Sequence, residues 1–155
     1  MTTPPPVRPS TQPHTTIVVH GADTGGRVAL IETVDVRGKE PPCHQHQWED
    51  EVLYVVAGDL AVCVGGTWTP APRGTTMLIP RGAEHGYAVL SDTARIVTTF
   101  APAGFEGFYQ AADAGGAWAD TTPLALERLL AKAAHYGCAI TGPRPGPPPP
   151  PASED

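Results

Sequence analysis

The sequence predicts an all-β jelly roll or barrel with two short helices near its C-terminal end. Glycine (17) and proline (19) together make up about 23% of the 155 residues, roughly twice their usual share. Such a high content of glycine and proline is typical of short strands joined by tight turns, and it argues against a helical bundle. Hydrophobic residues form 41% of the chain, which is enough for one packed core.

Short apolar or alternating runs bounded by turn residues indicate the strands. The expected strands are 16–20, 27–36, 51–56, 60–64, 67–69, 75–79, 85–90 and 94–100. Residues 57–59, Ala-Gly-Asp, predict a hairpin turn between two of these runs. After Pro102 the apolar spacing becomes helical, so helices are expected over 105–112 and 124–136, covering a sheet edge or the mouth of the barrel.

One domain is expected, over residues 15–142. The two ends of the chain, 1–14 and 143–155, are rich in proline, which cannot donate a backbone hydrogen bond to a sheet. They also carry little apolar surface to bury, so both are expected to be disordered tails.

Charge and composition exclude several classes of function. The net charge is -6 and no basic stripe occurs, which argues against nucleic-acid binding. No apolar run approaches the roughly 20 residues that span a bilayer, and the N-terminal residues lack the apolar region of a signal peptide, so a cytoplasmic protein is expected. Three widely spaced cysteines, at 43, 63 and 138, form neither a disulfide framework nor a CxxC metal site.

Three histidines and a glutamate are the candidate metal ligands. His44 and His46 are two residues apart, so on an extended segment both imidazoles point to the same face. Glu51 opens the next strand, where Asp50 would face the other way, and His85 follows a separate turn. Three neutral nitrogens and one carboxylate suit one divalent Fe, Mn, Ni, Co or Zn ion, with positions left for water, dioxygen or substrate.

The spacing of these residues closely resembles the two motifs of the cupin superfamily. The first, G-x5-H-x-H-x4-E-x6-G, is formed by residues 38–58. The second, G-x5-P-x-G-x2-H-x3-N, begins at Gly74, contains His85 and departs from the pattern where Val89 replaces the final asparagine. The resemblance implies a cupin jelly-roll barrel, or double-stranded β-helix, in which His44, His46, Glu51 and His85 hold the metal.

Further stretches resemble the small quercetin-dioxygenase-like cupins of bacteria, over about residues 15–143. They include LYVVAGDL, LIPRGAEHGY and FAPAGFEGFY. The resemblance implies a metal-dependent dioxygenase that acts on a flavonol-like or other enolisable aromatic molecule, with Glu51 accepting the substrate proton.

Two other functions are compatible with the same residues. Small cupins of aromatic polyketide pathways share the four-ligand pattern and act as non-oxidative cyclases or isomerases, in which the metal polarises a carbonyl. A non-catalytic cupin that binds a small molecule is the third interpretation, and the presence of all four ligands argues against it.

The pocket and the oligomeric state are predicted less directly. Candidate pocket residues are Trp48, Met77, Tyr87, Phe105 and Phe108, although Met77, Phe105 and Phe108 could equally be core residues. Tyr54 is expected outside the pocket, and Cys43 is expected to point away from the metal by strand alternation. An exposed sheet edge favours a homodimer, with residues 16–20 as the strand to exchange.

Overall fold

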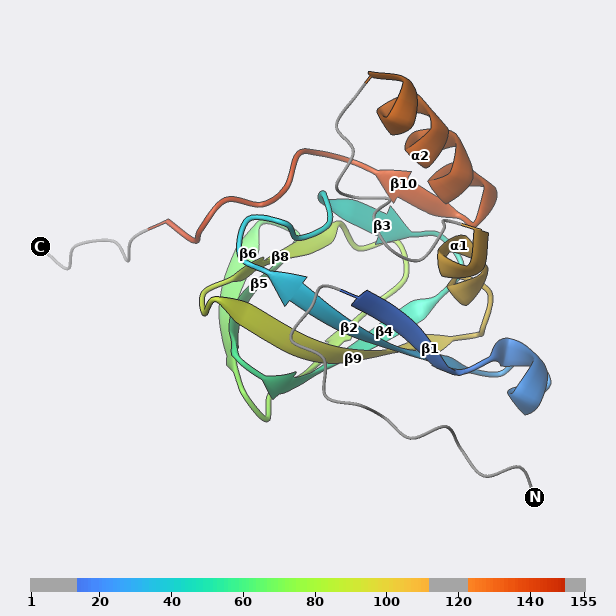
Figure 1. The fold of residues 1–155 in the computed structure, drawn as a ribbon, viewed down its shortest axis with the longest axis horizontal. Coiled ribbons are helices and arrows are strands. Elements are labelled where there is room, and N and C mark those ends of the chain that lie inside the picture. The colour runs from blue at the N-terminus through green and yellow to red at the C-terminus, as the bar shows by residue number, and fades with distance from the viewer. Residues whose placement is uncertain (1–13, 112–122, 150–155) are drawn as a thin grey trace, which may run out of the picture.

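The computed structural model describes residues 14–111 and 123–149, and its strands form two facing β-sheets (Figure 1). The strands are β1 (His14–Val19), β2 (Ala29–Val36), β3 (His44–His46), β4 (Asp50–Ala57), β5 (Asp59–Val64), β6 (Thr67–Pro72), β7 (Thr76–Ile79), β8 (His85–Val89), β9 (Thr93–Ala101) and β10 (Cys138–Ile140). Sheet A has the order β1-β2-β9-β4-β7, and sheet B has the order β10-β3-β8-β5-β6. Neighbouring strands of both sheets run antiparallel, so the predicted all-β jelly-roll architecture is confirmed.

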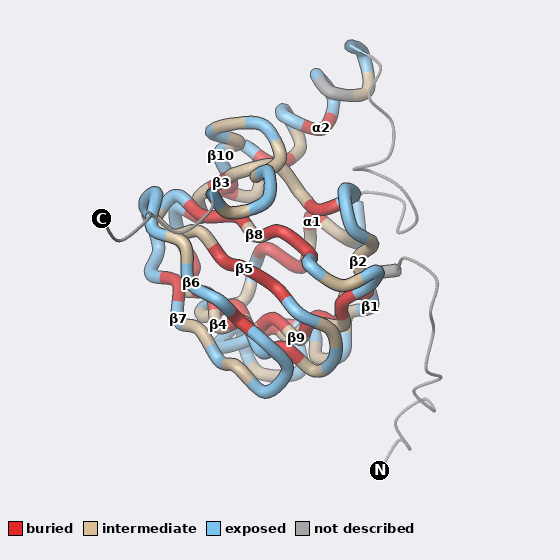
Figure 2. The backbone as a smooth tube through the Cα atoms, turned by 90° about the vertical axis from the view of Figure 1, so that its left-hand side faces the viewer, coloured by how far each residue is buried: buried red, intermediate tan, exposed pale blue. Residues whose placement is uncertain are grey.

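A hydrophobic cluster between the sheets occupies one half of the barrel. Leu53 and Val55 of β4 and Ile79 of β7 come from sheet A, and Leu60 and Val62 of β5 come from sheet B. Each of these side chains is at most 1% exposed, as the strand alternation predicts (Figure 2). Burial of this size stabilises the domain by roughly 1.5–3 kcal/mol for each fully buried side chain.

The second cluster joins the helices to the other half of the barrel. A short 3-10 turn, η1 (Gly21–Thr24), precedes β2, and the helices are α1 (Glu106–Ala111) and α2 (Pro123–His135). Phe105 and Phe108 pack with Phe100 of β9 and with Leu129 and Ala133 of α2. The helices therefore cover one end of the barrel. Within the described residues, neither helix is long and apolar enough to cross a membrane.

Two strands are absent from the sequence prediction, and one predicted strand is longer by three residues, while the ends of most others differ by one or two. Strands β3 and β10 were not among the predicted strands, because three residues are too few to establish a periodic pattern. They pair with each other in register, from His44–Ile140 to His46–Cys138. Strand β6 runs on to Pro72 because it is the edge strand of sheet B, where proline removes no hydrogen bond of the ladder.

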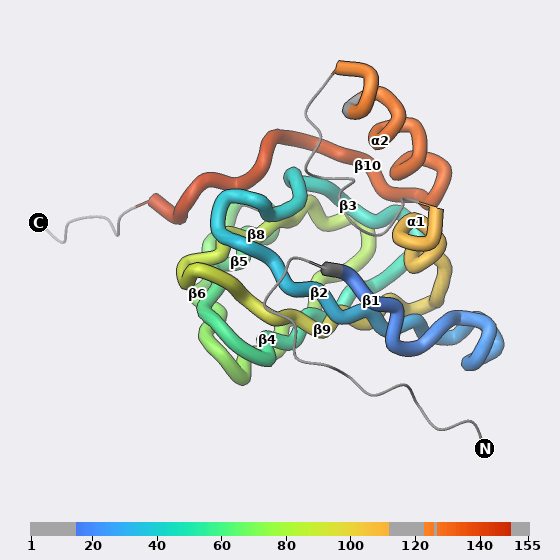
Figure 3. The backbone as a smooth tube through the Cα atoms, in the orientation of Figure 1, coloured from blue at the N-terminus to red at the C-terminus, as the bar shows by residue number. Residues whose placement is uncertain are grey.

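The C-terminal segment is bound to the domain beyond the predicted boundary at residue 142. The amide of Cys43 donates to the carbonyl of Pro143 at 3.0 Å, and Arg144 donates to the carbonyl of Gly38 at 3.3 Å. Residues 143–144 thus lie along the start of β3 (Figure 3), because proline keeps its carbonyl as an acceptor. Residues 1–13 and 150–155 of the two predicted tails lie outside the described residues.

The strand predicted to exchange between two copies corresponds to β1, which pairs with β2 of its own chain. β1 pairs with β2 from His14–Val34 to Val19–Leu30 and forms one edge of sheet A. Exchange of β1 between two copies, and the homodimer itself, stay predictions.

Candidate metal centre

Three strands of the two sheets bring the predicted ligands together. His44 and His46 lie on β3 and His85 on the neighbouring β8, where it pairs directly with His44. Glu51 lies on β4 of the facing sheet A. One ligand atom from each of the four residues lies within 4.8 Å of the others, and the side chains are at most 8% exposed.

Glu51 contacts two of the three histidines in this cluster. Its Oε2 lies 3.0 Å from Nε2 of His85 and 3.3 Å from Nε2 of His46. Asp50, the neighbouring carboxylate, points outward and binds the guanidinium of Arg81 at 2.9 Å. Strand alternation therefore separates the two carboxylates as expected, one into the barrel and one onto the surface.

Backbone carbonyls fix the ring nitrogens of two histidines. Nδ1 of His44 donates to the carbonyl of Pro42 at 2.8 Å, and Nδ1 of His85 donates to the carbonyl of Ala83 at 3.0 Å. A carbonyl can only accept, so the proton of each neutral ring is on Nδ1 and the lone pair is on Nε2. In this tautomer Nε2 of His85 and Oε2 of Glu51 are both acceptors, and they need a cation between them.

His46 has a carboxylate beside its second nitrogen instead of a carbonyl. Nδ1 of His46 lies 4.0 Å from Oε2 of Glu49, and both side chains are 2% exposed. Neither atom has a hydrogen-bond partner, and neither does Nε2 of His46. Buried polar atoms without partners are costly, so they mark a place that is completed by a bound group. No motif position identifies Glu49 in the sequence, and only the structure places it beside His46.

Burial and the close contacts among the four ligands also shift their pKa values. Burial, reinforced by the neighbouring His85 and His46, lowers the pKa of His44 to about 3, so this ring is neutral at ordinary pH. Burial alone would raise the pKa of Glu51, but the close imidazoles of His46 and His85 outweigh it and hold that pKa below its usual range. A neutral imidazole and an ionised carboxylate are the forms that bind metals. These residues therefore fit one divalent ion.

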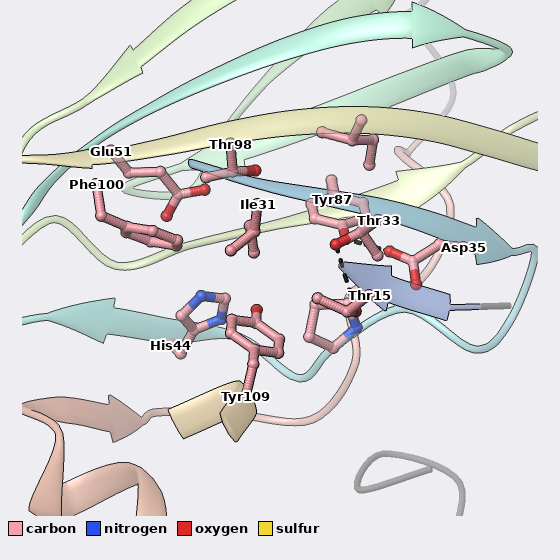
Figure 4. A pocket seen from close by; sticks show the side chains of 12 residues that line it. Thr15, Ile31, Thr33, Asp35, His44, Glu51, Tyr87, Thr98, Phe100 and Tyr109 are labelled. Carbon is pink, nitrogen blue, oxygen red and sulfur yellow. Dashed lines mark hydrogen bonds between the residues drawn. The ribbon is translucent and has the colours of Figure 1, made fainter. Parts of the chain in front are cut away.

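A narrow cavity of about 40 Å³ opens beside the ligands (Figure 4). Its lining residues come from both sheets, from the β2–β3 loop and from α1. They are Thr15, Ile31, Thr33, Asp35, Pro41, His44, Glu51, Tyr87, Ile96, Thr98, Phe100 and Tyr109. A volume of this size holds on the order of three water molecules, far below the roughly 300–1,000 Å³ of pockets for drug-sized ligands.

Among the predicted pocket residues, Tyr87 lines this cavity and four do not. Trp48 is 50% exposed and its indole lies against Gly137. Met77 packs against the first hydrophobic cluster. Phe105 and Phe108 stack on each other at 5.2 Å, and Phe105 meets the ring of His46 edge-on at 4.3 Å, so both belong to the core beneath the ligands. For Met77, strand alternation gives the face but not the position along the barrel, whereas Trp48, Phe105 and Phe108 lie outside the strands, where alternation predicts nothing.

Two further expectations concern residues outside the cavity. Tyr54 is 43% exposed and does not line it. Cys43 lies beside Gly86 and Gly142, on the side of β3 away from the ligands, and is not part of the cluster.

Comparison with known proteins agrees with this geometry. Residues 30–100 match the family described as Cupin domain. This part of the chain is similar to a cupin domain. The matched segment contains all four ligands.

Solved cupin structures show the same fold. The RmlC-like cupin family protein with a double-stranded β-helix fold from Methanocaldococcus jannaschii has a TM-score of 0.57 at 15% identity, covering 66% of this chain and 92% of that one. KdgF from Halomonas sp. has a TM-score of 0.52 at 25% identity, covering 57% and 76%. An uncharacterised protein of Streptomyces coelicolor is 35% identical over 54 residues, which are 35% of this chain. The match spans about half, 51%, of that relative.

Proposed function

We propose that the protein is a metal-dependent dioxygenase whose substrate is a small enolisable molecule. The observation that carries the proposal is the convergence of His44, His46, Glu51 and His85 beside a cavity that two of them line. A divalent transition metal held by these side chains would supply Lewis-acid activation of a substrate oxygen and, if redox-active, dioxygen chemistry.

The residues of the chain supply positioning, a proton acceptor and exclusion of water. Glu51 is ionised and lines the cavity, so its carboxylate can take the proton that an enolisable substrate loses. Ile31, Ile96 and Phe100 form an apolar wall beside it, which keeps bulk water from the reacting atoms.

The size of the cavity restricts the substrate. A flavonol has three rings, and a cavity of about 40 Å³ has no room for them. We therefore confine the proposal to hydroxyketones of a few carbon atoms, whose ketone end enters the cavity while the remaining atoms extend toward its half-buried end at Thr15, Thr33 and Asp35.

A non-oxidative isomerase or cyclase is the second candidate, and Asp35 favours it. This carboxyl group lines the same cavity as the ligands, and burial raises its pKa to about 6. A second group that exchanges protons near neutral pH suits reactions that move a proton without an oxidant.

The deciding experiment compares oxygen uptake with proton exchange. The protein is reconstituted separately with iron, manganese, nickel, cobalt or zinc and supplied with a four-carbon hydroxyketone in D2O, with and without oxygen. Oxygen consumption coupled to substrate loss, decreased at least about a hundredfold in Glu51→Gln with metal retained, is the expected result. Deuterium exchange without oxygen uptake would identify the isomerase type, and neither activity with any metal would leave a binding protein.

A further inference from the structure

The cavity has a polar end that lies away from the metal ligands (Figure 4). Glu51 and Phe100 lie at one end, and Thr15, Thr33 and Asp35 lie at the other. The motifs that identify the ligands do not include these three residues.

Strand geometry explains why the polar side chains meet. Ile31, Thr33 and Asp35 alternate along β2, so all three face the cavity, and Asp35 lies about 13 Å along the strand from Ile31. Thr15 of β1 pairs directly with Thr33, and their Oγ1 atoms are 3.5 Å apart. The neighbouring strands β1 and β2 thus contribute two hydroxyls and a carboxyl group to one place.

Tyr87 connects this end to the ligand strand. It follows His85 by two residues on β8, and its hydroxyl donates to Oδ2 of Asp35. Among the described residues, Tyr87 is the partner found for the Asp35 carboxyl group, and it occupies Oδ2. The other oxygen, Oδ1, is therefore available to accept a hydrogen bond from a ligand. A half-buried carboxyl group fixed by a tyrosine is a preformed hydrogen-bonding site.

The charges around the cavity select the kind of group that fits. No lysine or arginine is among the described lining residues, which include the acidic Asp35 and Glu51. Glu40 also acts on Asp35 as a like charge. A carboxylate or phosphate at this end would be repelled and would have no cationic partner. A neutral hydroxyl can both donate to and accept from the groups present.

We propose that Asp35, Tyr87, Thr15 and Thr33 form a hydroxyl-binding site, and that the substrate is a small uncharged hydroxyketone with a further hydroxyl at its distal end. This inference rests on the proposed function, since the ketone end is assigned to the metal ligands. The raised pKa of Asp35, caused mainly by burial, is consistent with it, because the protonated form donates to a hydroxyl and the ionised form accepts from one.

The test measures the binding of three four-carbon probes to the zinc-loaded protein by calorimetry. 1,3,4-Trihydroxybutan-2-one has distal hydroxyls, 1-hydroxybutan-2-one has a distal methyl group, and 4-hydroxy-3-oxobutanoate has a distal carboxylate. We expect the trihydroxy probe to bind about fivefold to tenfold more tightly than the methyl probe, since one or two net hydrogen bonds are gained. The carboxylate probe should bind most weakly.

Variants then assign the preference to this end of the cavity. Asp35→Leu should reduce the hydroxyl preference to less than about twofold while the affinity for the methyl probe is retained. Thr33→Val, which preserves shape, provides the same comparison with a smaller loss if the Asp35 variant does not fold. Asp92→Asn, whose side chain is exposed and pairs with Arg37, is the matched control and should keep the full preference.

The outcomes separate the two proposals. Equal affinity for the three probes, a preference for the carboxylate, or no binding of any probe overturns the hydroxyl-binding site. If the methyl probe still binds in a zinc-dependent way, the proposed function survives that result. A hydroxyl preference that depends on Asp35 but not on zinc supports the site and contradicts the assignment of the ketone to the metal.

Discussion

His85 shows at the scale of one residue why the ligand cluster needs a cation. Its Nε2 and Oε2 of Glu51 lie 3.0 Å apart, while Ala83 holds the ring proton on Nδ1. Hydrogen bonding to Glu51 raises the pKa of His85 against the opposing effect of burial. Without a metal, a proton therefore lies between Nε2 of His85 and Oε2 of Glu51. Metal binding therefore displaces a proton from the pair.

We expect His85→Ala to lower the metal content from near one ion per chain to less than about a tenth of that, because one of four ligands is lost. Mass spectrometry of the purified protein measures the content, and circular dichroism measures the fold, which should persist. His135→Ala removes an exposed histidine of α2 and serves as control. Full metal retention in His85→Ala would place the ion elsewhere, and an unfolded variant would make the metal structural.

Glu49 is expected to position His46, since its unpartnered Oε2 lies 4.0 Å from the unpartnered Nδ1 of that ring. Loss of such an outer carboxylate typically weakens metal binding by about 10–100-fold. Glu49→Gln should therefore weaken zinc affinity by at least about tenfold, as measured by competition with a chelator. The exposed Glu84→Gln is the control. Equal affinities in the two variants would rule out a positioning role.

Asp35 gives a pH dependence with a defined sign. Its pKa rises from 3.8 to about 6 on folding, mainly through burial, so the folded state holds the proton more tightly than the unfolded chain. This contribution to stability is complete below about pH 4 and is lost as the pH rises through about 6. Ionisable neighbours are Tyr87 on β8, Tyr109 on α1 and Glu40.

We expect Asp35→Asn to gain about 2–3 kcal/mol in the free energy of unfolding, relative to the unsubstituted protein, between pH 4 and pH 7.5. Urea denaturation of both proteins with a chelator present measures this difference, and the other titrating groups cancel in the comparison. A difference that does not change with pH would show that Asp35 has an ordinary pKa.

At the scale of elements, the hairpin between β4 and β5 depends on Gly58. This residue has φ +81°, and a Cβ there would collide with the carbonyl oxygen of Thr93 and approach Oγ of Ser91 to 2.7 Å. Gly66, in the next hairpin, has φ +84°, and a Cβ at that position would meet nothing within 4 Å. The two glycines share the backbone conformation and differ in the space around them.

Gly58→Ala should accordingly cost about 3 kcal/mol of stability, combining a left-handed backbone with a steric clash. Gly66→Ala should cost about 1 kcal/mol from the backbone alone. Chemical denaturation measures both. Equal losses would mean that β9 moves aside without cost.

The elements also explain what the sequence could and could not predict. His44 and His46 are two residues apart on one strand, so local alternation is enough to place both on the same face. Asp35 and Tyr109 join the site from β2 and α1, and only the packing of these elements brings them to the cavity. In α2, helical spacing predicted the helix, yet Leu130 is 40% exposed while Leu129 is buried, because tertiary contacts decide which part of an apolar face is covered.

For the whole molecule, the ligand cluster links the two sheets. Glu51 belongs to sheet A, whereas His44, His46 and His85 belong to sheet B. A metal held by all four would connect the sheets at the end of the barrel that the helices cover. An ion that binds the folded protein and not the unfolded chain stabilises the fold by mass action, by about 2.7 kcal/mol at a free concentration of 100 times Kd.

We therefore expect removal of the metal to lower the melting temperature by roughly 5–10 °C, since about 2–4 °C corresponds to each kcal/mol in a domain of this size. Differential scanning calorimetry of zinc-loaded and chelator-treated protein measures the shift. His85→Ala should melt at the same temperature with and without zinc, which ties the shift to the cluster rather than to surface binding. A zinc-dependent shift that persists in this variant would contradict the link between the sheets, because the stabilising ion would then be bound without the ligand from β8.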